Sequence, residues 1–499
     1  MMGPLGTRRK ALHLAVAAVT AGTLAGCSVA PKVITPAEHQ ALVVADRALM
    51  FVEQEPRGER ITLEEAIARA LKYNLEARVQ MMEQVVRAGQ LDLSRYEMLP
   101  TLAANAGWVT RSNENLVVSE NTVTGATSTD PTLSQDRQRS TANLTLTWNI
   151  LDFGVSYLQA RQNADNMLIA EQRRRRLLNQ VMQQVRDAYW RAATAEPLAE
   201  EARPMLEQAH QALADARSTE TLRLRSPVDS LNYQKGLLQV IRSLEQIQRD
   251  EAIAKAELAS LMGLPPSTRM RLVLPPKESM RVPEVALGVA EMEELALQQR
   301  PELIEEAYQK RIAALEVRKA LLGMLPGLTF NFGANYDSNS YNVNNDWLDA
   351  GARVSWNLFS IASGPQAIEV AEARESLADA RRLALGMAVV TQVHVGYQEY
   401  LRRRHNFEQT RALDEIEQRL FGHAERAAEA QSESPLQLIR ARLAALYSEV
   451  GMYQAYSDLQ SATANLYLSV GMNPLPFDVS DRDLGTLTQA VAEGMAQWQ

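Results

Sequence analysis

Few residues of this chain have the types and spacing that catalysis or metal binding requires. Its six histidines are scattered without a helical pair at metal spacing, and His405 follows a run of arginines typical of a solvated helix face. No glycine-rich phosphate loop, nucleophile elbow or zinc-protease motif occurs. The methionines favour core filling over a copper relay, and Arg173–Arg176 favours inter-helix pairing or lumen lining. The sequence therefore predicts no enzyme, no cofactor and no metal site.

Cys27 is the one residue with a clear covalent chemistry, and as the single cysteine it excludes disulfides and thiolate clusters. A basic segment at 8–10 and a short apolar stretch at 11–21 precede it, which is typical of a signal peptide over 1–26. Leu24-Ala25-Gly26-Cys27 resembles the bacterial lipobox, which implies a covalent lipid, palmitate included, on Cys27, and Ser28 then permits sorting to the outer membrane. The alternative is a free thiol in a leader that is simply cleaved away.

The composition excludes several classes of protein. With 499 residues, 46% of them hydrophobic and 22% charged, the chain has the length of about three domains. The mean hydropathy of −0.24 is too polar for a protein with many membrane-spanning helices. A net charge of −8 disfavours a nucleic-acid surface, and only 6% aromatic residues disfavours a deep apolar ligand pocket.

The chain contains an internal duplication. Met98-Leu99-Pro100 recurs 226 residues later, at 324–326, and beyond the first strands the offset becomes 208. The matches at 208 include Trp148-Asn149 with Trp356-Asn357, Ser226-Pro227 with Ser434-Pro435, and Gly263 with Gly471. The shorter offset indicates a longer loop in the first half. We therefore expect repeats at 61–264 and 288–472, a proline-rich linker at 265–287, a lipid-anchored segment at 27–60 and a tail at 473–499.

Four segments alternate apolar and polar residues, which predicts strands at about 101–110, 141–149, 327–336 and 349–358. The apolar face could rest on a soluble core or on lipid. Lipid is favoured by four tryptophans in or beside the strands, as an interfacial girdle requires, namely Trp108, Trp148, Trp347 and Trp356. The segments 111–140 and 337–349 are polar, as exposed loops are. In this arrangement Leu146 and Phe330 face lipid, whereas Thr145 and Asn331 face water.

Four strands are too few to close a membrane barrel, and open edges in lipid leave backbone groups unpaired. If these strands face lipid, several copies must therefore share one barrel, with the polar faces lining its lumen.

Long helices surround the predicted strands. We expect helices at 62–98, 155–218, 227–262, 288–324, 362–431 and 435–470. The longest approach ~100 Å at 1.5 Å per residue. Pro197 and Pro204 predict a kink or break, and Gly263 and Gly471 predict helix ends. The composition is that of coiled coils rather than of lipid-facing helices. The turns at 218–227 and 430–435 are then the far tips of a helical tunnel.

The duplicated halves, the repeated Met-Leu-Pro and Ser-Pro segments and the lipobox together resemble the TolC-like outer-membrane efflux protein family over residues 60–473. This resemblance implies a mainly α fold with a small membrane β part: a homotrimer with a twelve-stranded barrel and a twelve-helix periplasmic tunnel. It implies a periplasmic adaptor and an inner-membrane pump as partners. The segment 30–60 lacks the Trp-rich opening of the multidrug lipoprotein branch, so a multidrug antiporter, a metal exporter and a type I secretion system all remain open.

The resemblance also implies functional positions at the tips. Ser226 and Ser434 stand before Pro227 and Pro435 as expected N-caps of the returning helices. The adaptor-contact positions are Thr219, Glu220, Ser226, Pro227, Ser432, Glu433, Ser434 and Pro435. Candidates for an acidic constriction of the lumen are Asp414, Glu415, Glu417, Glu425 and Glu429. For each of these side chains a well-capped turn or a solvated helix surface is the alternative.

The function predicted from the sequence is a passive exit duct in the outer membrane of a Gram-negative bacterium. A structural coiled-coil envelope lipoprotein is the main alternative, but it leaves the alternating strands unexplained. A cell-surface enzyme or binding module would need a concave polar site, for which the sequence offers no residues.

Overall fold

The computed structural model describes residues 31–51, 54–56, 58–128, 130–221, 226–430, 435–472 and 483–496. The chain divides into two compact units, at residues 1–54 and 55–499. In the first unit, α2 (Pro36–Met50) begins with a capping box. The Thr35 hydroxyl accepts a hydrogen bond from the Glu38 amide at 3.2 Å, and the Glu38 carboxylate accepts one from the Thr35 amide at 2.9 Å. This unit carries no buried side chain in its helix.

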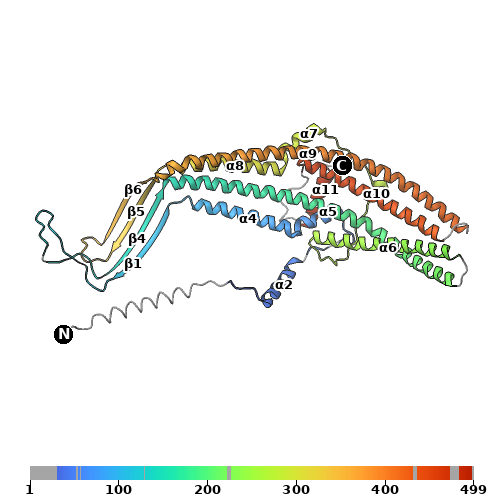
Figure 1. The fold of residues 1–499 in the computed structure, drawn as a ribbon, viewed down its shortest axis with the longest axis horizontal. Coiled ribbons are helices and arrows are strands. Elements are labelled where there is room, and N and C mark those ends of the chain that lie inside the picture. The colour runs from blue at the N-terminus through green and yellow to red at the C-terminus, as the bar shows by residue number, and fades with distance from the viewer. Residues whose placement is uncertain are drawn as a thin grey trace. The chain divides into compact units, whose positions relative to one another are not determined.

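The second unit consists of two matching halves of long helices joined to one four-stranded sheet (Figure 1), and β2 and β3 pair in a separate two-stranded sheet. Its helices are α3 (Leu63–Tyr73), α4 (Leu75–Tyr96), α5 (Ile150–Thr221), α6 (Pro227–Leu261), α7 (Val289–Gln299), α8 (Pro301–Leu322), α9 (Phe359–Glu429), α10 (Pro435–Val470) and α11 (Leu484–Ala496). Its strands are β1 (Thr101–Thr110), β2 (Leu116–Val117), β3 (Thr132–Leu133), β4 (Gln138–Asn149), β5 (Gly327–Asp337) and β6 (Asp346–Ser355). The four long strands and the mainly helical class are as predicted.

The helices form one layer near the sheet and two antiparallel pairs away from it. Next to the sheet, α4, α5, α8 and α9 lie side by side in that order (Figure 1). With 72 and 71 residues, α5 and α9 each extend for about 105 Å. Their distal parts pair with α6 and α10, and α10 also contacts α5, which joins the two halves.

The helix expected before each pair of strands is divided in two, so the single helices predicted at 62–98 and 288–324 are wrong. Asn74 separates α3 from α4, and Arg300 separates α7 from α8. Pro301 explains the second break, because a residue before proline is driven out of the helical region. Asn74 has no proline after it. Its side chain instead accepts hydrogen bonds from the Glu76 and Ala77 amides at 3.0 and 3.2 Å, which begins a new helix.

Of the kink or break predicted at Pro197 and Pro204, the break does not occur, because α5 continues through both. Each proline removes one backbone hydrogen bond, but both lie on the exposed side of the helix. The opposite side packs Ala199, Ala202 and Met205, each at most 1% exposed, against α6. This burial holds the helix together where local propensity would end it.

The sheet has the order β1-β4-β5-β6, and every pair is antiparallel. In the first half Thr101 pairs with Thr147, and in the second half Gly327 pairs with Ser355. These are equivalent residues at the offsets of 226 and 208. The duplication read from the sequence is therefore repeated in the pairing register.

Glycines end α6 and α10 as predicted. Gly263 and Gly471 have φ values of +70° and +86°, a region that other residues rarely adopt. A Cβ on Gly471 would also lie 2.9 Å from the backbone carbon of Gln299, so this glycine permits α10 to end against the α7–α8 break.

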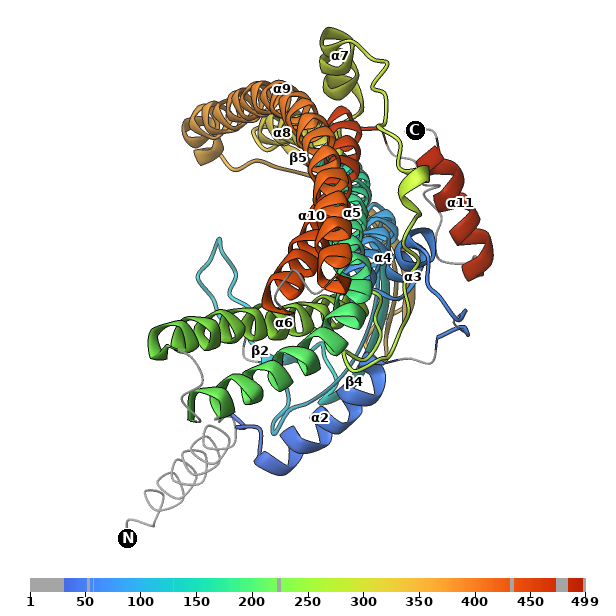
Figure 2. The same ribbon diagram turned by 90° about the vertical axis from the view of Figure 1, so that its right-hand side faces the viewer.

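The inter-repeat linker and the C-terminal segment contribute to the main hydrophobic core, so they are more than a tether and a tail. Linker residues Met270, Leu272 and Met280 are buried there, together with Leu487 of α11. The helix α11 packs on α3 (Figure 2). The backbone of Ile61 forms a parallel bridge with that of Leu272. This core surrounds the middle of the long helices.

No helix in the described part of the chain is both long enough and apolar enough to cross a membrane.

Candidate functional site

The sheet has one continuous apolar face. Cross-strand pairing aligns its side chains in rows, of which the central one is Leu102, Leu146, Phe332 and Ala350. The adjoining rows are Ala104, Leu144, Ala334 and Leu348 on one side and Trp148, Phe330 and Ala352 on the other. In a single copy this face is uncovered: Leu348 is 84% exposed and Leu102 62% exposed. An apolar area of this extent requires lipid or another protein as cover.

Aromatic side chains lie at both ends of this apolar face. Trp108 pairs with Ser140, eight residues along β4 from Trp148, which is a separation of about 26 Å. This agrees with the ~25 Å apolar band and flanking girdles of outer-membrane barrels. Trp347 does not belong to the girdle, contrary to the prediction. It pairs with Asn335 on the opposite face, in phase with Arg353 rather than with Ala350 and Ala352.

The second face of the sheet is polar and rich in small residues. Its rows are Asn149, Thr329 and Arg353; Thr101, Thr147, Asn331 and Gly351; Ala103, Thr145, Gly333 and Asp349; and Asn105, Asn143, Asn335 and Trp347. The amide of Asn105 donates to the Asn143 side chain at 2.9 Å. The predicted division, with Leu146 and Phe330 on one face and Thr145 and Asn331 on the other, is confirmed.

Both edges of the unit are open. The outer edges of β1 and β6 have no strand partner among the described residues. The helices that adjoin these edges, α4 and α9, carry exposed apolar seams at heptad spacing. The α4 seam is Leu75, Val79, Met82, Val86, Leu93 and Tyr96, and the α9 seam includes Val370, Leu377 and Met387.

The loops at the far end of the sheet are tied together by polar contacts. Asn339, only 4% exposed, accepts a hydrogen bond from the Asp136 amide at 2.9 Å and donates one to the Ser134 carbonyl at 3.1 Å. The Asp136 carboxylate binds the Ser340 hydroxyl at 2.8 Å. The loops predicted as exposed polar segments are therefore joined across the β4–β5 junction.

The two helical turns at the opposite end are partly described. Ser226 precedes α6 as predicted, but its side chain makes no capping hydrogen bond, so the predicted capping role of this hydroxyl is wrong. Pro227 occupies the first turn, where the absent N–H has no intrahelical partner to lose. The Glu220 carboxylate accepts a hydrogen bond from Gln234 at 2.5 Å, which joins α5 to α6.

Other predicted positions lie outside the described part. Ser432, Glu433 and Ser434, and Cys27 with the signal peptide, belong to undescribed segments, as do the side chains of Thr219 and Pro435.

Among the acidic candidates for a constriction, the structure separates Asp414 from the others. Asp414 is 4% exposed and binds the Lys277 ammonium of the linker at 2.9 Å. Lys277 also contacts Glu449 of α10 at 3.2 Å. Burial opposes the charge on Lys277, but these two carboxylates raise its pKa above the ordinary value. Asp414 thus joins the linker to α9, and its predicted place in a constriction stays a prediction.

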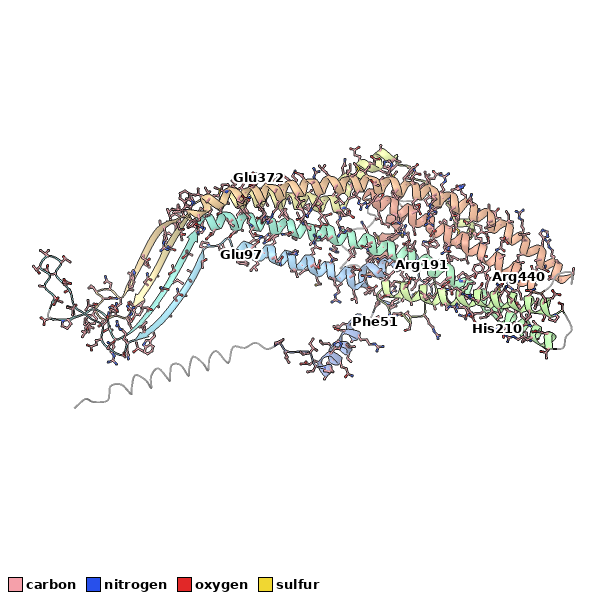
Figure 3. All side chains as sticks on the ribbon, viewed as in Figure 1. Phe51, Glu97, Arg191, His210, Glu372 and Arg440 are labelled. Atoms are coloured by element: carbon pink, nitrogen blue, oxygen red, sulfur yellow. The ribbon has the colours of Figure 1, made fainter. Side chains whose placement is uncertain are left out.

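The remaining candidates lie at the helix surface. Glu415, Glu425 and Glu429 are exposed, and Glu417 is half-buried. Figure 3 shows charged side chains, including Glu372 and Arg440, along the surface of the helices. Hydrogen bonding to Arg402 lowers the pKa of nearby Glu399 to about 2. In the basic run of α5, Arg173 makes inter-helix pairing, one of the two roles predicted for the run, since it contacts Glu305 of α8 at 2.7 Å.

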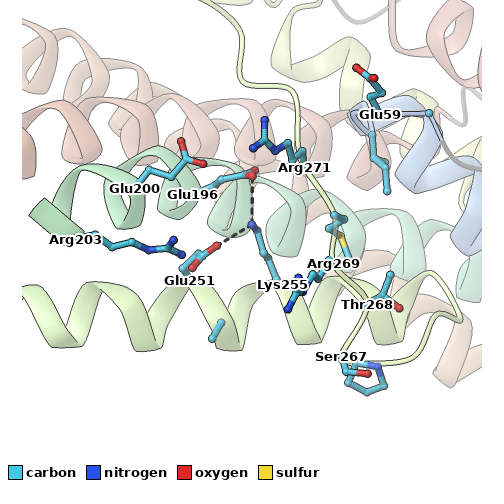
Figure 4. A pocket seen from close by; sticks show the side chains of 15 residues that line it. Glu59, Glu196, Glu200, Arg203, Glu251, Lys255, Ser267, Thr268, Arg269 and Arg271 are labelled. Carbon is cyan, nitrogen blue, oxygen red and sulfur yellow. Dashed lines mark ion pairs between the residues drawn. The ribbon is translucent and has the colours of Figure 1, made fainter.

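A hollow of about 1010 Å³ lies between α5, α6 and the linker (Figure 4). At its wall Lys255 contacts Glu251 at 2.7 Å and Glu196 at 3.3 Å. Its wall carries both acidic and basic side chains, among them Glu200, Arg203 and Arg271. Within the described ranges, no three His, Cys, Asp or Glu residues are grouped as ligands of a metal ion.

Sequence reasoning missed the residues that hold the linker and the helical layer in place. The Tyr189 hydroxyl binds the Val273 carbonyl at 2.7 Å, and the Tyr400 hydroxyl binds the Pro283 carbonyl at 2.7 Å. Asp165, 4% exposed, pairs with Arg311 across α5 and α8. Tyr189 matches Tyr397 at the offset of 208, but in the second half it is Tyr400 that binds the linker. No sequence signal indicated that a linker carbonyl is the partner of either hydroxyl.

Comparison with solved structures identifies the fold. The Campylobacter jejuni CmeC outer membrane channel superposes with a TM-score of 0.66 at 12% identity, covering 89% of this chain and 94% of that one. A membrane protein from Pseudomonas aeruginosa gives 0.64 at 16% identity, covering 85% and 92%. The outer-membrane channel OprN gives 0.62 at 17% identity, covering 82% and 89%. The sequence matches no protein-family model and no curated protein.

The long helices with their four-stranded sheet are thus the TolC-like outer-membrane factor fold. At these identities the similarity establishes the fold, and the activity is a separate inference.

Proposed function

We propose that this chain is one subunit of an outer-membrane exit duct that conducts substrates passively from the periplasm to the exterior. The observation that carries the proposal is the sheet, which has an exposed apolar face between two aromatic ends, a polar opposite face and two open edges. In lipid each unpaired backbone group of an open edge costs several kcal/mol, so closure by further copies is required. A homotrimer would then place twelve strands around one lumen.

The internal duplication supports a specific geometry for this closure. Within the chain, the β4–β5 junction joins the second long strand of the first repeat to the first strand of the second repeat, and Leu146 pairs there with Phe332. The equivalent junction between copies joins β6 to β1 of the next copy. Applying the two offsets places Val354 opposite Ala106 of that copy.

The helices give the same result. In α5 the Gln162 amide donates to the Ile312 carbonyl of α8 at 3.2 Å. The equivalent pair between copies is Val370 of α9 with Val86 of α4, and these side chains are 44% and 57% exposed in the single copy. Two exposed valines at the position of an established contact indicate a complementary, head-to-tail interface.

Cysteine crosslinking tests this assembly. A chain carrying both Val86→Cys and Val370→Cys should form disulfide-linked oligomers under oxidation in the outer membrane. Either single variant should not, and Val86→Cys with Glu372→Cys, two residues along α9, should link poorly. The same protein should conduct ions across a planar bilayer. Monomeric, non-conducting protein would support a structural coiled-coil lipoprotein instead.

The remaining parts of the proposal concern the setting of the duct. The lipobox-like segment supports a lipid anchor at Cys27, and the paired helical ends support contact with a periplasmic adaptor that connects to an inner-membrane pump. Selection of cargo would then belong largely to the pump.

A further inference from the structure

The polar face of the sheet carries few charged side chains, and only some of them form ion pairs. Of the charged residues in β1, β4, β5 and β6, the polar face holds Arg139, Asp337, Asp349 and Arg353, while the apolar face holds Asp346. Arg139 and Asp337 form an ion pair at 3.2 Å across β4 and β5. This pair is neutral overall, which leaves the two charges of β6, Asp349 and Arg353, to be accounted for.

Asp349 is held in a fixed position. Asn335 donates a hydrogen bond to its carboxylate, which lies over Gly333. A Cβ at Gly333 would collide with that carboxylate. Within the chain Thr141 pairs with Asp337. The equivalent of Thr141 at the offset of 208 is Asp349, and the equivalent of Asp337 at the offset of 226 is Arg111. Asp349 therefore lies opposite Arg111 of the next copy. In the assembled ring Asp349 therefore lies beside a cation.

Arg353 lacks such a partner. It pairs with Thr329 in its own copy, and the row continues to Asn149. No acidic side chain of the described residues forms an ion pair with it. Arg353 is the equivalent of Thr145, which pairs with Gly333. The equivalent of Gly333 is Gly107, so Gly107 of the next copy is the neighbour of Arg353 across the junction. The whole of β1 carries no charged residue, so a different register along that strand would not neutralise Arg353 either.

We infer that Arg353 forms a ring of uncompensated positive charge on the lumen wall, which biases the barrel toward anionic solutes. This inference rests on the proposed duct, because only the assembled barrel gives these residues a lumen. Arg353 lies in the part of β6 that leads to α9, four residues or about 13 Å along the strand from Asp349. An anion passing from the helices outward would meet this ring before the Asp349 ring.

Charged rings of this kind determine ion preference in other pores. In a wide, water-filled lumen the effect is screened by salt, with a Debye length of about 30 Å at 0.01 M and about 3 Å at 1 M. The preference should therefore be strongest in dilute electrolyte and disappear in concentrated electrolyte.

The test is the reversal potential of the assembled channel in a dilute potassium chloride gradient. Arg353→Gln should shift the reversal potential toward the equilibrium potential of potassium, whereas Arg353→Lys should retain the wild-type value. Asp349→Asn should shift it in the opposite direction. Asp346→Asn, three residues from Asp349 but on the apolar face, is the matched control and should leave it unchanged.

The outcomes separate the inference from the proposed function. Wild-type protein that forms no conducting oligomer would refute the duct itself. A conducting Arg353→Gln channel with the wild-type reversal potential would overturn the inference and leave the duct standing. A shift in Asp346→Asn equal to that in Asp349→Asn would do the same. If Arg353→Gln does not assemble, Arg353→Lys and Asp349→Asn still decide: loss of anion preference with Lys, or no shift with Asn, would overturn the inference.

Discussion

Asn74 and Arg300 lie 226 residues apart and hold the same backbone conformation, with φ −66° and ψ 126° at Asn74 and φ −64° and ψ 127° at Arg300. Each interrupts a helix at the same point before a strand pair, by different chemistry. Arg300 is fixed by the following proline, whereas Asn74 depends on its own side chain. The Asn74 amide also donates to the Leu261 carbonyl at the end of α6, at 3.2 Å.

Asn74→Ala should therefore destabilise the protein more than Arg300→Ala. It removes a helix cap worth about 1 kcal/mol, and it leaves the Leu261 carbonyl without this donor. Arg300→Ala keeps Pro301 but loses the ion pair with Glu302 and the hydrogen bond to Gln392 of α9. Urea unfolding midpoints of both variants, measured at one protein concentration, check this order. Equal midpoints would show that the break is set by tertiary contacts rather than by the Asn74 side chain.

The two faces of the sheet should differ in their tolerance of charge. Leu146→Arg places a cation on the apolar face near its middle, which costs about 2–4 kcal/mol in a bilayer. Thr145→Arg places the same side chain on the polar face at a much smaller cost. We expect Leu146→Arg to reduce the amount of heat-modifiable oligomer in the membrane far more than Thr145→Arg. Similar amounts from the two variants would contradict a membrane barrel.

Lys277 should stabilise the contact between the linker and the second helix pair. Lys277→Met leaves the buried Asp414 carboxylate without its cation, a loss of about 1–3 kcal/mol. Because the folded-state pKa of Lys277 is raised, its contribution is present at all pH values below its unfolded pKa and is lost only as pH rises through the folded pKa. The destabilisation should consequently be the same at about pH 6 and about pH 8.

Unfolding midpoints of Lys277→Met at the two pH values test this sign. Lys277→Arg is the matched control, because it keeps the charge and should recover part of the stability. A destabilisation that changes between the two pH values would assign the effect to another titrating group.

Cys27 should be the site of lipid attachment. Cys27→Ala removes the thiol that the lipid modification requires, so labelling with radioactive palmitate should be lost and the precursor should remain uncleaved. Persistent labelling of this variant would exclude the anchor. Oligomer formation by the barrel should survive, because in the proposed duct the apolar face of the sheet also holds the protein in the bilayer.

The helical turns should face the periplasm and the sheet loops the exterior. Cysteines placed at Thr219, Glu220, Ser432 or Glu433 should crosslink to a periplasmic adaptor in intact cells. Cysteines at Asn121 or Asn342, in the loops beyond the strands, should react with a membrane-impermeant thiol reagent added outside. Labelling of the turns from outside together with crosslinking of the loops to the adaptor would invert the proposed orientation.

The sequence by itself determined the duplication, the four long strands, the ends of α6 and α10 and the division between Leu146 and Thr145. These features depend on residues close together in the chain: alternation along a strand, heptad spacing along a helix, and glycine or proline at an end. Alternation also placed Trp347 in phase with Arg353, so its position on the polar face could have been read from the sequence.

The tertiary structure alone decided which distant groups meet. Lys277 and Asp414 are 137 residues apart. No local pattern shows that a lysine of the linker would pair with a buried carboxylate on a helix. The continuity of α5 through Pro197 and Pro204 likewise depends on packing against α6, which outweighs the local cost of each proline. The preference of a single residue for or against a helix is worth ~1–3 kcal/mol, and packing contacts that form only in the folded chain are worth as much or more. Where the two disagree, folded contacts decide the structure.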